Sequence, residues 1–278
     1  WKDRVRLVFQ LNPESNRQSV QLMVQDTRGN PLGQVSAVYD SASIHGNLAL
    51  VCHSFENKSE LHGKPVVAFE QLKLSGTRLR GGDEQRWGPI LWTQYTVDEN
   101  ILKLSAQLPP LGSNDNRHAN LELNKGDGYT QAAEARIDDR ARVALFRIED
   151  WDDKRPVSYR VVYTLDGEKH TYEGMIRKNP IDKNDFSVAA FTGNKDYAFP
   201  NTPMVENLKK LDPDLLFFSG DQIYETVAGY GIVRKPLGQA TLDYLRKWYL
   251  LGWSFGEWLK NRHSVIIPHN PTIYQGNL

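Results

Sequence analysis

The chain of 278 residues contains a single cysteine, Cys52, so neither an internal disulfide nor a zinc site built on cysteines can form. Neither sign of charge is in excess, because 34 lysines and arginines balance 34 aspartates and glutamates. That balance gives no sign of the basic surface by which proteins bind nucleic acids or anionic membranes. No apolar run approaches the length of a membrane span. What remains is the composition of an ordinary globular protein.

Short segments in which apolar and polar residues alternate fill the first part of the chain, with Gly, Pro and Asn between them. They include the sets Val5, Leu7, Phe9; Val20, Leu22, Val24; Leu48, Leu50, Cys52; and Val67, Phe69, Leu72, Leu74. A two-residue period between turns is typical of antiparallel β-sandwiches. We therefore predict a β-sandwich, lectin-like or jelly-roll-like, over residues 1–112.

A polar stretch at residues 112–117 is followed by a second group of short strands, predicted at residues 133–137, 143–148, 158–164 and 171–176. Asp166-Gly167 between the last two is the signal of a tight β-hairpin. Trp151 is expected in the core, since a tryptophan in a small sandwich is more often buried than exposed. These features predict a fibronectin-like sandwich over residues 113–182.

The pattern changes at Phe186, where an apolar strand (186–191) precedes a helix that starts with Asn201-Thr202-Pro203. Val205, Leu208 and Leu211 fall on one face of that helix, and a second apolar strand, Leu215–Phe218, follows it. A strand, a helix and a strand in this order predict two parallel strands joined by a right-handed crossover. A longer helix over 241–259, with Leu242, Leu245, Tyr249 and Phe255 on its buried side, and a strand over 264–267 complete the pattern.

Polar side chains follow each of these three strands: Asn194 after the first, Asp221 and Tyr224 after the second, and His269 after the third. Open α/β sheets bind ligands at the carboxyl ends of their strands. Hard oxygen ligands and a histidine brought together there suit a hydrolytic site with two cations. The alternative for Asp221 is that it only caps the next helix or turn.

Several stretches resemble the PhoD-like alkaline phosphatases of the calcineurin-like metallophosphatase superfamily. These are PDLLFFSGDQIYE (213–225), YLRKWYLLGW (244–253), YQGNL (274–278) and FSVAAFTGN (186–194). The resemblance to the catalytic domain covers residues 186–278, and the β region before it is similar to the sandwich that precedes that domain in the family. The implied fold is multidomain: an N-terminal all-β sandwich region followed by a partial α/β metallophosphatase domain over residues 183–278.

The resemblance also implies a function, a metal-dependent hydrolase of small phosphoric esters that is secreted or periplasmic, with a site for two cations, iron and calcium. Asp221 matches the bridging aspartate, Tyr224 the metal-bound tyrosine, and Asn194 a ligand of the first motif. Arg246 is a candidate for binding the substrate phosphate through its planar guanidinium; the alternative is an arginine exposed to solvent on its helix. His269 stands where the family has an aspartate.

One departure from the family pattern concerns the third motif. Members carry Asp-Asp-His-Asp or Asp-Asp-His-Glu before the Tyr-Gln-Gly-Asn stretch, whereas this chain has His269-Asn270-Pro271-Thr272. Because His269 cannot bridge two cations as a carboxylate does, one metal site should be weakened or abolished. The later histidines of the family have no counterpart here, so we expect a fragment with an incomplete catalytic half and with reduced activity or none.

The alternative hypothesis is a non-catalytic protein whose β-sandwiches bind a glycan or a surface partner, with the α/β part as scaffold. A dinucleotide-binding fold is excluded, because no G-x-G-x-x-G motif follows either strand. The sequence predicts no oligomeric state.

Overall fold

The computed structural model describes residues 4–14, 16–40, 69, 71, 73–77, 79, 87–194, 199–224 and 232–267. The chain divides into two compact units, Trp1–Phe55 and Glu56–Leu278. Among the described residues, no helix is both long enough and apolar enough to cross a lipid bilayer.

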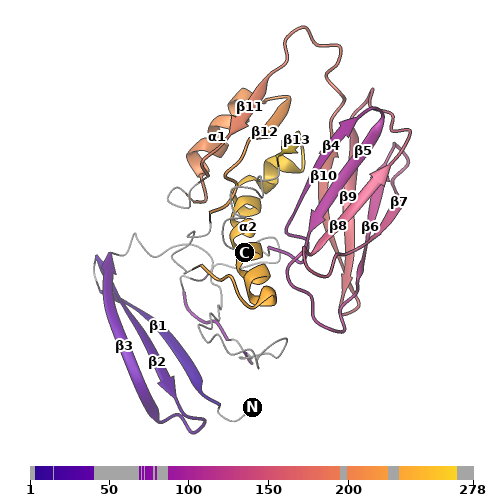
Figure 1. Ribbon diagram of the computed structural model, residues 1–278. Helices are drawn as coiled ribbons and strands as arrows, with labels where there is room; N and C mark the ends of the chain where they lie inside the picture. The colour runs from indigo at the N-terminus through magenta and orange to yellow at the C-terminus, as the bar shows by residue number, and fades with distance from the viewer. Residues whose placement is uncertain are drawn as a thin grey trace. The chain divides into compact units, whose positions relative to one another are not determined.

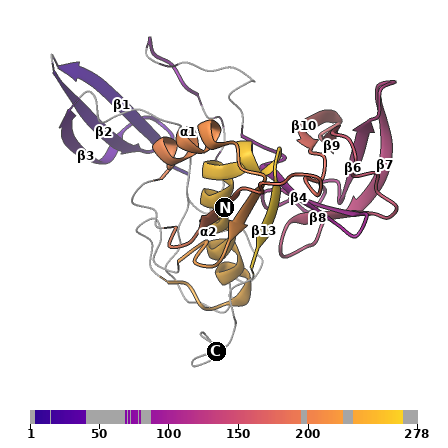
Figure 2. The same ribbon diagram turned by 90° about the horizontal axis from the view of Figure 1, so that it is seen from above.

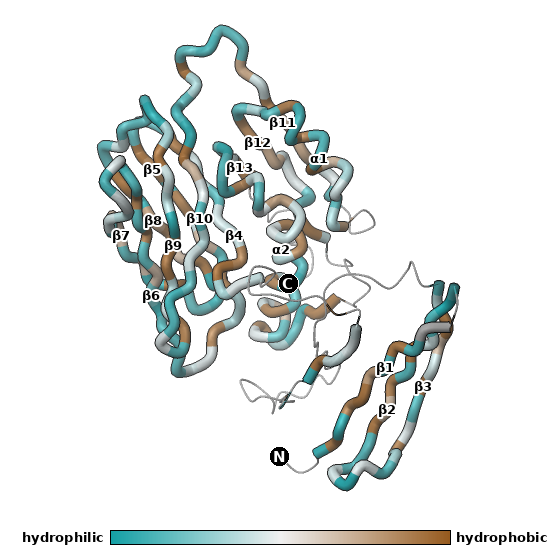
Figure 3. Tube along the Cα trace, turned by 180° about the vertical axis from the view of Figure 1, so that it is seen from behind, coloured by the Kyte–Doolittle hydropathy of each residue, from teal (hydrophilic) through white to brown (hydrophobic). Residues whose placement is uncertain are grey.

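The first unit contains one antiparallel sheet of three strands, in the order β1 (Arg6–Glu14), β2 (Arg17–Gln25) and β3 (Pro31–Asp40). Phe9 pairs with Leu22 and Leu22 with Val35, so their side chains lie on one face. Figure 3 shows the hydrophobic positions along β1 and β2. The strands predicted around Phe9 and Leu22 are confirmed, whereas β3 was not predicted. The strand predicted at residues 48–52 lies outside the described residues.

The second unit contains two larger sheets (Figure 1). The four-stranded sheet has the order β10-β9-β6-β7 and the six-stranded sheet the order β11-β12-β13-β4-β5-β8. The strands of the four-stranded sheet are β6 (His118–Asn124), β7 (Tyr129–Arg136), β9 (Val157–Leu165) and β10 (Glu168–Ile176). The three strands at one end of the larger sheet are β4 (Trp92–Asp98), β5 (Ile101–Gln107) and β8 (Val143–Ile148).

A β-sandwich forms where the four-stranded sheet packs on β4, β5 and β8. Leu104 from one sheet and Leu121 and Val161 from the other are fully or almost fully buried in one core. Trp151 is in the same core, as predicted. Asp166-Gly167 joins β9 to β10 with positive φ angles of 51° and 83°, the conformation of the predicted hairpin turn.

Strand pairing continues across the predicted domain boundary at residue 112. β5, which precedes that residue, pairs antiparallel with β8, which follows it, from Leu102↔Ile148 to Gln107↔Val143. Alternating apolar residues indicate a strand but not its partner. The sandwich therefore takes β4 and β5 from the segment that was predicted to belong to a separate domain.

Three parallel strands occupy the other end of the six-stranded sheet, and two helices connect them. They are β11 (Val188–Phe191), α1 (Thr202–Leu211), β12 (Leu215–Phe218), α2 (Leu237–Leu259) and β13 (His263–Ile266). Both strand pairs are parallel, so the predicted β-α-β unit is confirmed. β13 in turn pairs with β4 through His263↔Tyr95, which joins this end of the sheet to the sandwich.

The two helices contribute to one apolar core with these strands (Figure 2). Leu208 of α1, Phe255 of α2 and Phe218 of β12 are buried together in it. The prediction that Leu242 lies on the buried side of α2 is wrong, because this residue is 47% exposed. Leu211, on the predicted apolar face of α1, is 73% exposed at the end of that helix. Both positions lie at the edge of the apolar stripe of their helix, where a period of 3.6 residues turns the side chain toward solvent.

Candidate functional site

The carboxyl ends of β11 and β12 meet at one edge of the sheet. The strands are parallel and in register, with Phe191 opposite Phe218, so the chain leaves both strands at the same level. The amide of Ser219 donates to the carbonyl oxygen of Phe191 at 3.0 Å, and the amide of Asn194 donates to the carbonyl oxygen of Asp221 at 3.1 Å. The structure therefore brings Asn194 and Asp221 together, as the sequence predicted.

Asp221 occupies a sharp turn directly after the strand. Its φ angle is +55°, in the left-handed region that few side chains adopt, and Gly220 before it has φ +143°. The hydroxyl of Tyr224, three residues on, donates to Oδ2 of Asp221 at 3.0 Å. This contact joins two of the predicted metal ligands through their side chains.

The alternative role for Asp221 was to cap the next helix or turn. Among the described residues the helix cap finds no support, whereas Asp221 does lie in a turn, with φ +55°. The cap residues of the two described helices are Asn201 for α1 and Pro236 for α2. Asn201 itself makes no capping bond with its side chain. Its Nδ2 instead donates to Oγ of Ser254 on α2 at 3.3 Å.

The third strand ends beside the second. The amide of Ile267, directly after β13, donates to the carbonyl oxygen of Phe218 at 3.0 Å. Gln222 is buried at the same place, and its Nε2 donates to the carbonyl oxygens of Phe218 and Ile267, each at 3.3 Å. His269, the predicted ligand from this strand, lies outside the described residues.

Arg246, the predicted phosphate-binding residue, is on α2 and is held by Asp243. Its Nη2 lies 2.6 Å from Oδ1 of Asp243, while Nζ of Lys247 lies 2.5 Å from the other carboxylate oxygen. Burial raises the pKa of Asp243, but the hydrogen bonds from Lys247 and Arg246 outweigh it and leave that pKa below its usual value. Asp243 thus stays ionised and fixes both cationic side chains on the helix.

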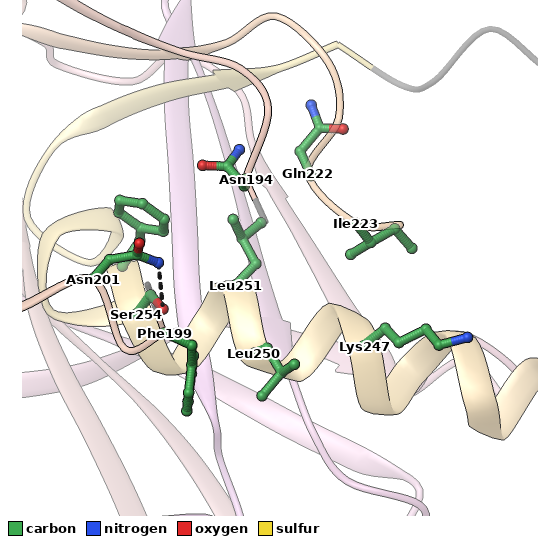
Figure 4. A pocket seen from close by; sticks show the side chains of 10 residues that line it. Asn194, Phe199, Asn201, Gln222, Ile223, Lys247, Leu250, Leu251 and Ser254 are labelled. Atoms are coloured by element: carbon green, nitrogen blue, oxygen red, sulfur yellow. Dashed lines mark hydrogen bonds between the residues drawn. The ribbon is translucent and has the colours of Figure 1, made fainter. Parts of the chain in front are cut away.

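A small pocket lies between α2 and the loops that follow β11 and β12 (Figure 4). Asn194 and Gln222 line it from the strand ends, and Lys247 and Leu251 line it from the helix. Lys247 was not predicted from the sequence, where its neighbour Arg246 was selected instead. The available signal was the spacing of Asp243 and Lys247, four residues apart and hence on one helix face.

Asp221 and Tyr224 carry oxygen atoms of the kind that hard cations prefer as ligands. Their side-chain oxygens lie 3.0 Å apart, an ordinary length for a hydrogen bond from a hydroxyl to a carboxylate. Within the described ranges, no group of three His, Cys, Asp or Glu side chains could hold a metal ion. Of the predicted ligands, Asp221 and Tyr224 are the pair that the structure brings into side-chain contact.

Comparisons with known proteins identify no family. No family model matches the chain, and neither does any curated protein. Among solved structures, the twitchin kinase region from C. elegans is 12% identical, with a TM-score of 0.24, and the match covers 37% of this chain and 20% of that one. A mutant of IsdX2-NEAT5 in complex with heme is 17% identical, with a TM-score of 0.22, and the match covers 32% of this chain and 77% of that one. Similarities this weak carry no argument about function.

Proposed function

We propose that this chain derives from a PhoD-like, metal-dependent hydrolase of phosphoric esters, and that Asp221 and Tyr224 are ligands of its cation site. The observation that carries the proposal is the contact of 3.0 Å between the Tyr224 hydroxyl and Oδ2 of Asp221. It lies past the carboxyl end of a parallel strand, where α/β enzymes place their ligands. The cations implied by the resemblance, iron and calcium, are the first to be tested.

Each side chain has a distinct role in this proposal. A bound cation would neutralise phosphate oxygens and lower the pKa of a bound water. Asp221 would hold the cation with its carboxylate, and the turn at φ +55° would keep that carboxylate at the edge of the sheet. Asn194 is placed beside it through the bond to the Asp221 carbonyl.

Arg246 is the proposed contact for the substrate phosphate. A guanidinium group binds two phosphate oxygens at once, in a planar arrangement that a lysine cannot match. The ion pair with Asp243 at 2.6 Å restricts the orientation of Arg246. Lys247, bound to the same carboxylate, places a second positive charge on this part of α2.

The test is hydrolysis of p-nitrophenyl phosphate by the purified chain supplied with iron and calcium. Asp221→Asn removes a charged cation ligand and should lower turnover at least about a hundredfold, since such a cation contributes several kcal/mol to catalysis. Asp127→Asn is the matched control, because Asp127 is exposed in the turn between β6 and β7. Turnover that Asp221→Asn leaves at the wild-type level would contradict the proposal, and a wild-type chain without turnover would favour the binding-protein alternative.

A further inference from the structure

Gln222 has a buried amide side chain that joins the ends of two strands. It directly follows Asp221, and the whole residue is only 8% exposed. Its Nε2 donates to the carbonyl oxygen of Phe218, the last residue of β12, and to that of Ile267, directly after β13. One side chain thus connects the carboxyl ends of the second and third parallel strands.

The chemistry of these contacts requires an amide. Both partners are carbonyl oxygens, which only accept hydrogen bonds, so the nitrogen of Gln222 must face them. An NH₂ group has two hydrogens and can serve both carbonyl oxygens at the same time. A glutamate of the same length has no hydrogen to donate when ionised, and a methionine has none at all.

Asp221 is held between this amide and Asn194. On one side, its carbonyl oxygen accepts the amide hydrogen of Asn194 at 3.1 Å. On the other side, the next residue is anchored by the two bonds of Gln222. A non-glycine residue with a positive φ angle persists when its surroundings fix it from several directions, and these bonds do so for Asp221 at φ +55°.

We infer that Gln222 is a positioning residue that keeps Asp221 at the edge of the sheet and acts on the cation site only through it. The part that concerns cations rests on the proposed function. The part that concerns the position of Asp221 rests on the hydrogen bonds alone.

The experiment compares Gln222→Met with the wild-type chain by hydrogen exchange and by calcium binding. Methionine has nearly the same length but cannot donate, so the turn should loosen, and the amide of Asn194 should exchange at least about tenfold faster. The calcium dissociation constant should rise by a similar factor. Gln222→Asn keeps the amide on a shorter side chain and should recover part of the protection.

Gln107→Met is the matched control for a purely structural effect. Gln107 is also buried (3% exposed), and its Nε2 also donates to backbone carbonyl oxygens, among them that of Ala141 at 2.9 Å. It lies on β5, which two strands separate from β12 in the sheet. The control should lower global stability. It should not change the calcium affinity, and the amide of Asn194 should exchange no faster relative to the other amides than it does in the wild-type chain.

Unchanged exchange at Asn194 in Gln222→Met would overturn the positioning role, whatever happens to activity. Faster exchange at Asn194 with undiminished calcium affinity would overturn the claim that Gln222 acts on the cation site. A wild-type chain that binds no cation and hydrolyses no ester would refute the proposed function instead, and the exchange result would still decide whether Gln222 holds Asp221.

Discussion

At the scale of single residues, the proposed cation site depends on the contact between the Tyr224 hydroxyl and the Asp221 carboxylate. A turn needs only the backbone of Asp221 and the glycine before it, whereas the contact at 3.0 Å joins two side-chain oxygens. One oxygen belongs to a carboxylate and the other to a phenol, and both are hard ligands. The role of this pair can be tested without disturbing the strand.

Tyr224→Phe removes the hydroxyl and keeps the ring. If the hydroxyl is a ligand, calcium affinity should fall about tenfold or more, since hydrogen bonds and ligand contacts to charged groups contribute roughly 1.5–3 kcal/mol. Isothermal titration with calcium measures the change. Equal affinity in the variant and the wild type would show that the phenol only packs against the turn. Tyr163→Phe, which removes a hydroxyl in the sandwich, serves as control.

A second residue predicts how stability depends on pH. His263 is 7% exposed at the start of β13, with its ring centre 5.1 Å from that of Tyr95. Burial lowers the pKa of His263 below its ordinary value of 6.5. Backbone hydrogen bonds with Arg177 and Lys178 oppose this shift, and the charge of Arg177 adds to it. The unfolded chain therefore takes up this proton more readily than the folded chain.

Stability should fall as the pH drops below 6.5, by at most about 1.4 kcal/mol for each pH unit from this histidine. His263→Phe removes the titration, so the variant should lose less stability than the wild type between about pH 7.5 and 5.5. Urea unfolding of the wild type and of His263→Phe at the two pH values measures the loss of stability in each protein. Equal losses of stability in the two proteins would mean that His263 has the same pKa in the folded and unfolded states.

At the scale of elements, the contact between α2 and β4 depends on a glycine in the middle of the helix. A Cβ atom on Gly252 would lie 2.0 Å from Cε3 of Trp92, whereas a Cβ on Gly238 in the first turn of α2 would meet nothing within 4 Å. Trp92 is almost fully buried against this part of the helix. The glycine therefore sets how closely α2 can approach the sheet.

Gly252→Ala should destabilise the protein by about 3 kcal/mol or more, because the added methyl group forces the helix away from Trp92. Gly238→Ala should be neutral or slightly stabilising, since alanine favours helix by about 1 kcal/mol where there is space. Thermal unfolding followed by circular dichroism compares the two. Similar melting temperatures for both variants would contradict the packing described.

The elements near the site, and the parallel pairing of β11 with β12, could largely be predicted from local sequence. Apolar runs at 186–191 and 215–218 predicted β11 and β12, and the order of strand, helix and strand predicted their parallel pairing. The helix predicted from residue 241 begins at Leu237, still within its apolar pattern. Leu242 was assigned wrongly to the core, because periodicity alone does not show how much of the helix the sheet covers.

At the scale of the second unit, one sheet belongs to both the sandwich and the parallel strands. β4 pairs with β5 on one side and with β13 on the other. Tyr159 of β9 strengthens the connection: its hydroxyl donates to the carbonyl oxygen of Lys260 at 3.0 Å and lies 2.5 Å from Oγ1 of Thr93. The sequence predicted separate domains here, since alternation does not encode pairing between distant strands.

This connection predicts that the sandwich and the parallel strands unfold together. Tyr159→Phe leaves the Thr93 hydroxyl and the Lys260 carbonyl oxygen without this partner in a buried place, at a cost of about 1–3 kcal/mol. Urea unfolding should show the same midpoint shift by tryptophan fluorescence and by far-ultraviolet circular dichroism. Two separate transitions would show that the two parts are independent domains, as the sequence suggested.

Cation binding at the edge of β12 is tested most directly by isothermal titration of the wild-type chain and of Asp221→Asn with calcium, with terbium as a luminescent substitute. We predict binding to the wild-type chain, luminescence excited through nearby aromatic rings, and at least about a tenfold loss of affinity in Asp221→Asn with Asp127→Asn unchanged. A wild-type chain that binds neither ion, or an Asp221→Asn variant that binds both as tightly as the wild type, would contradict the cation site proposed for Asp221.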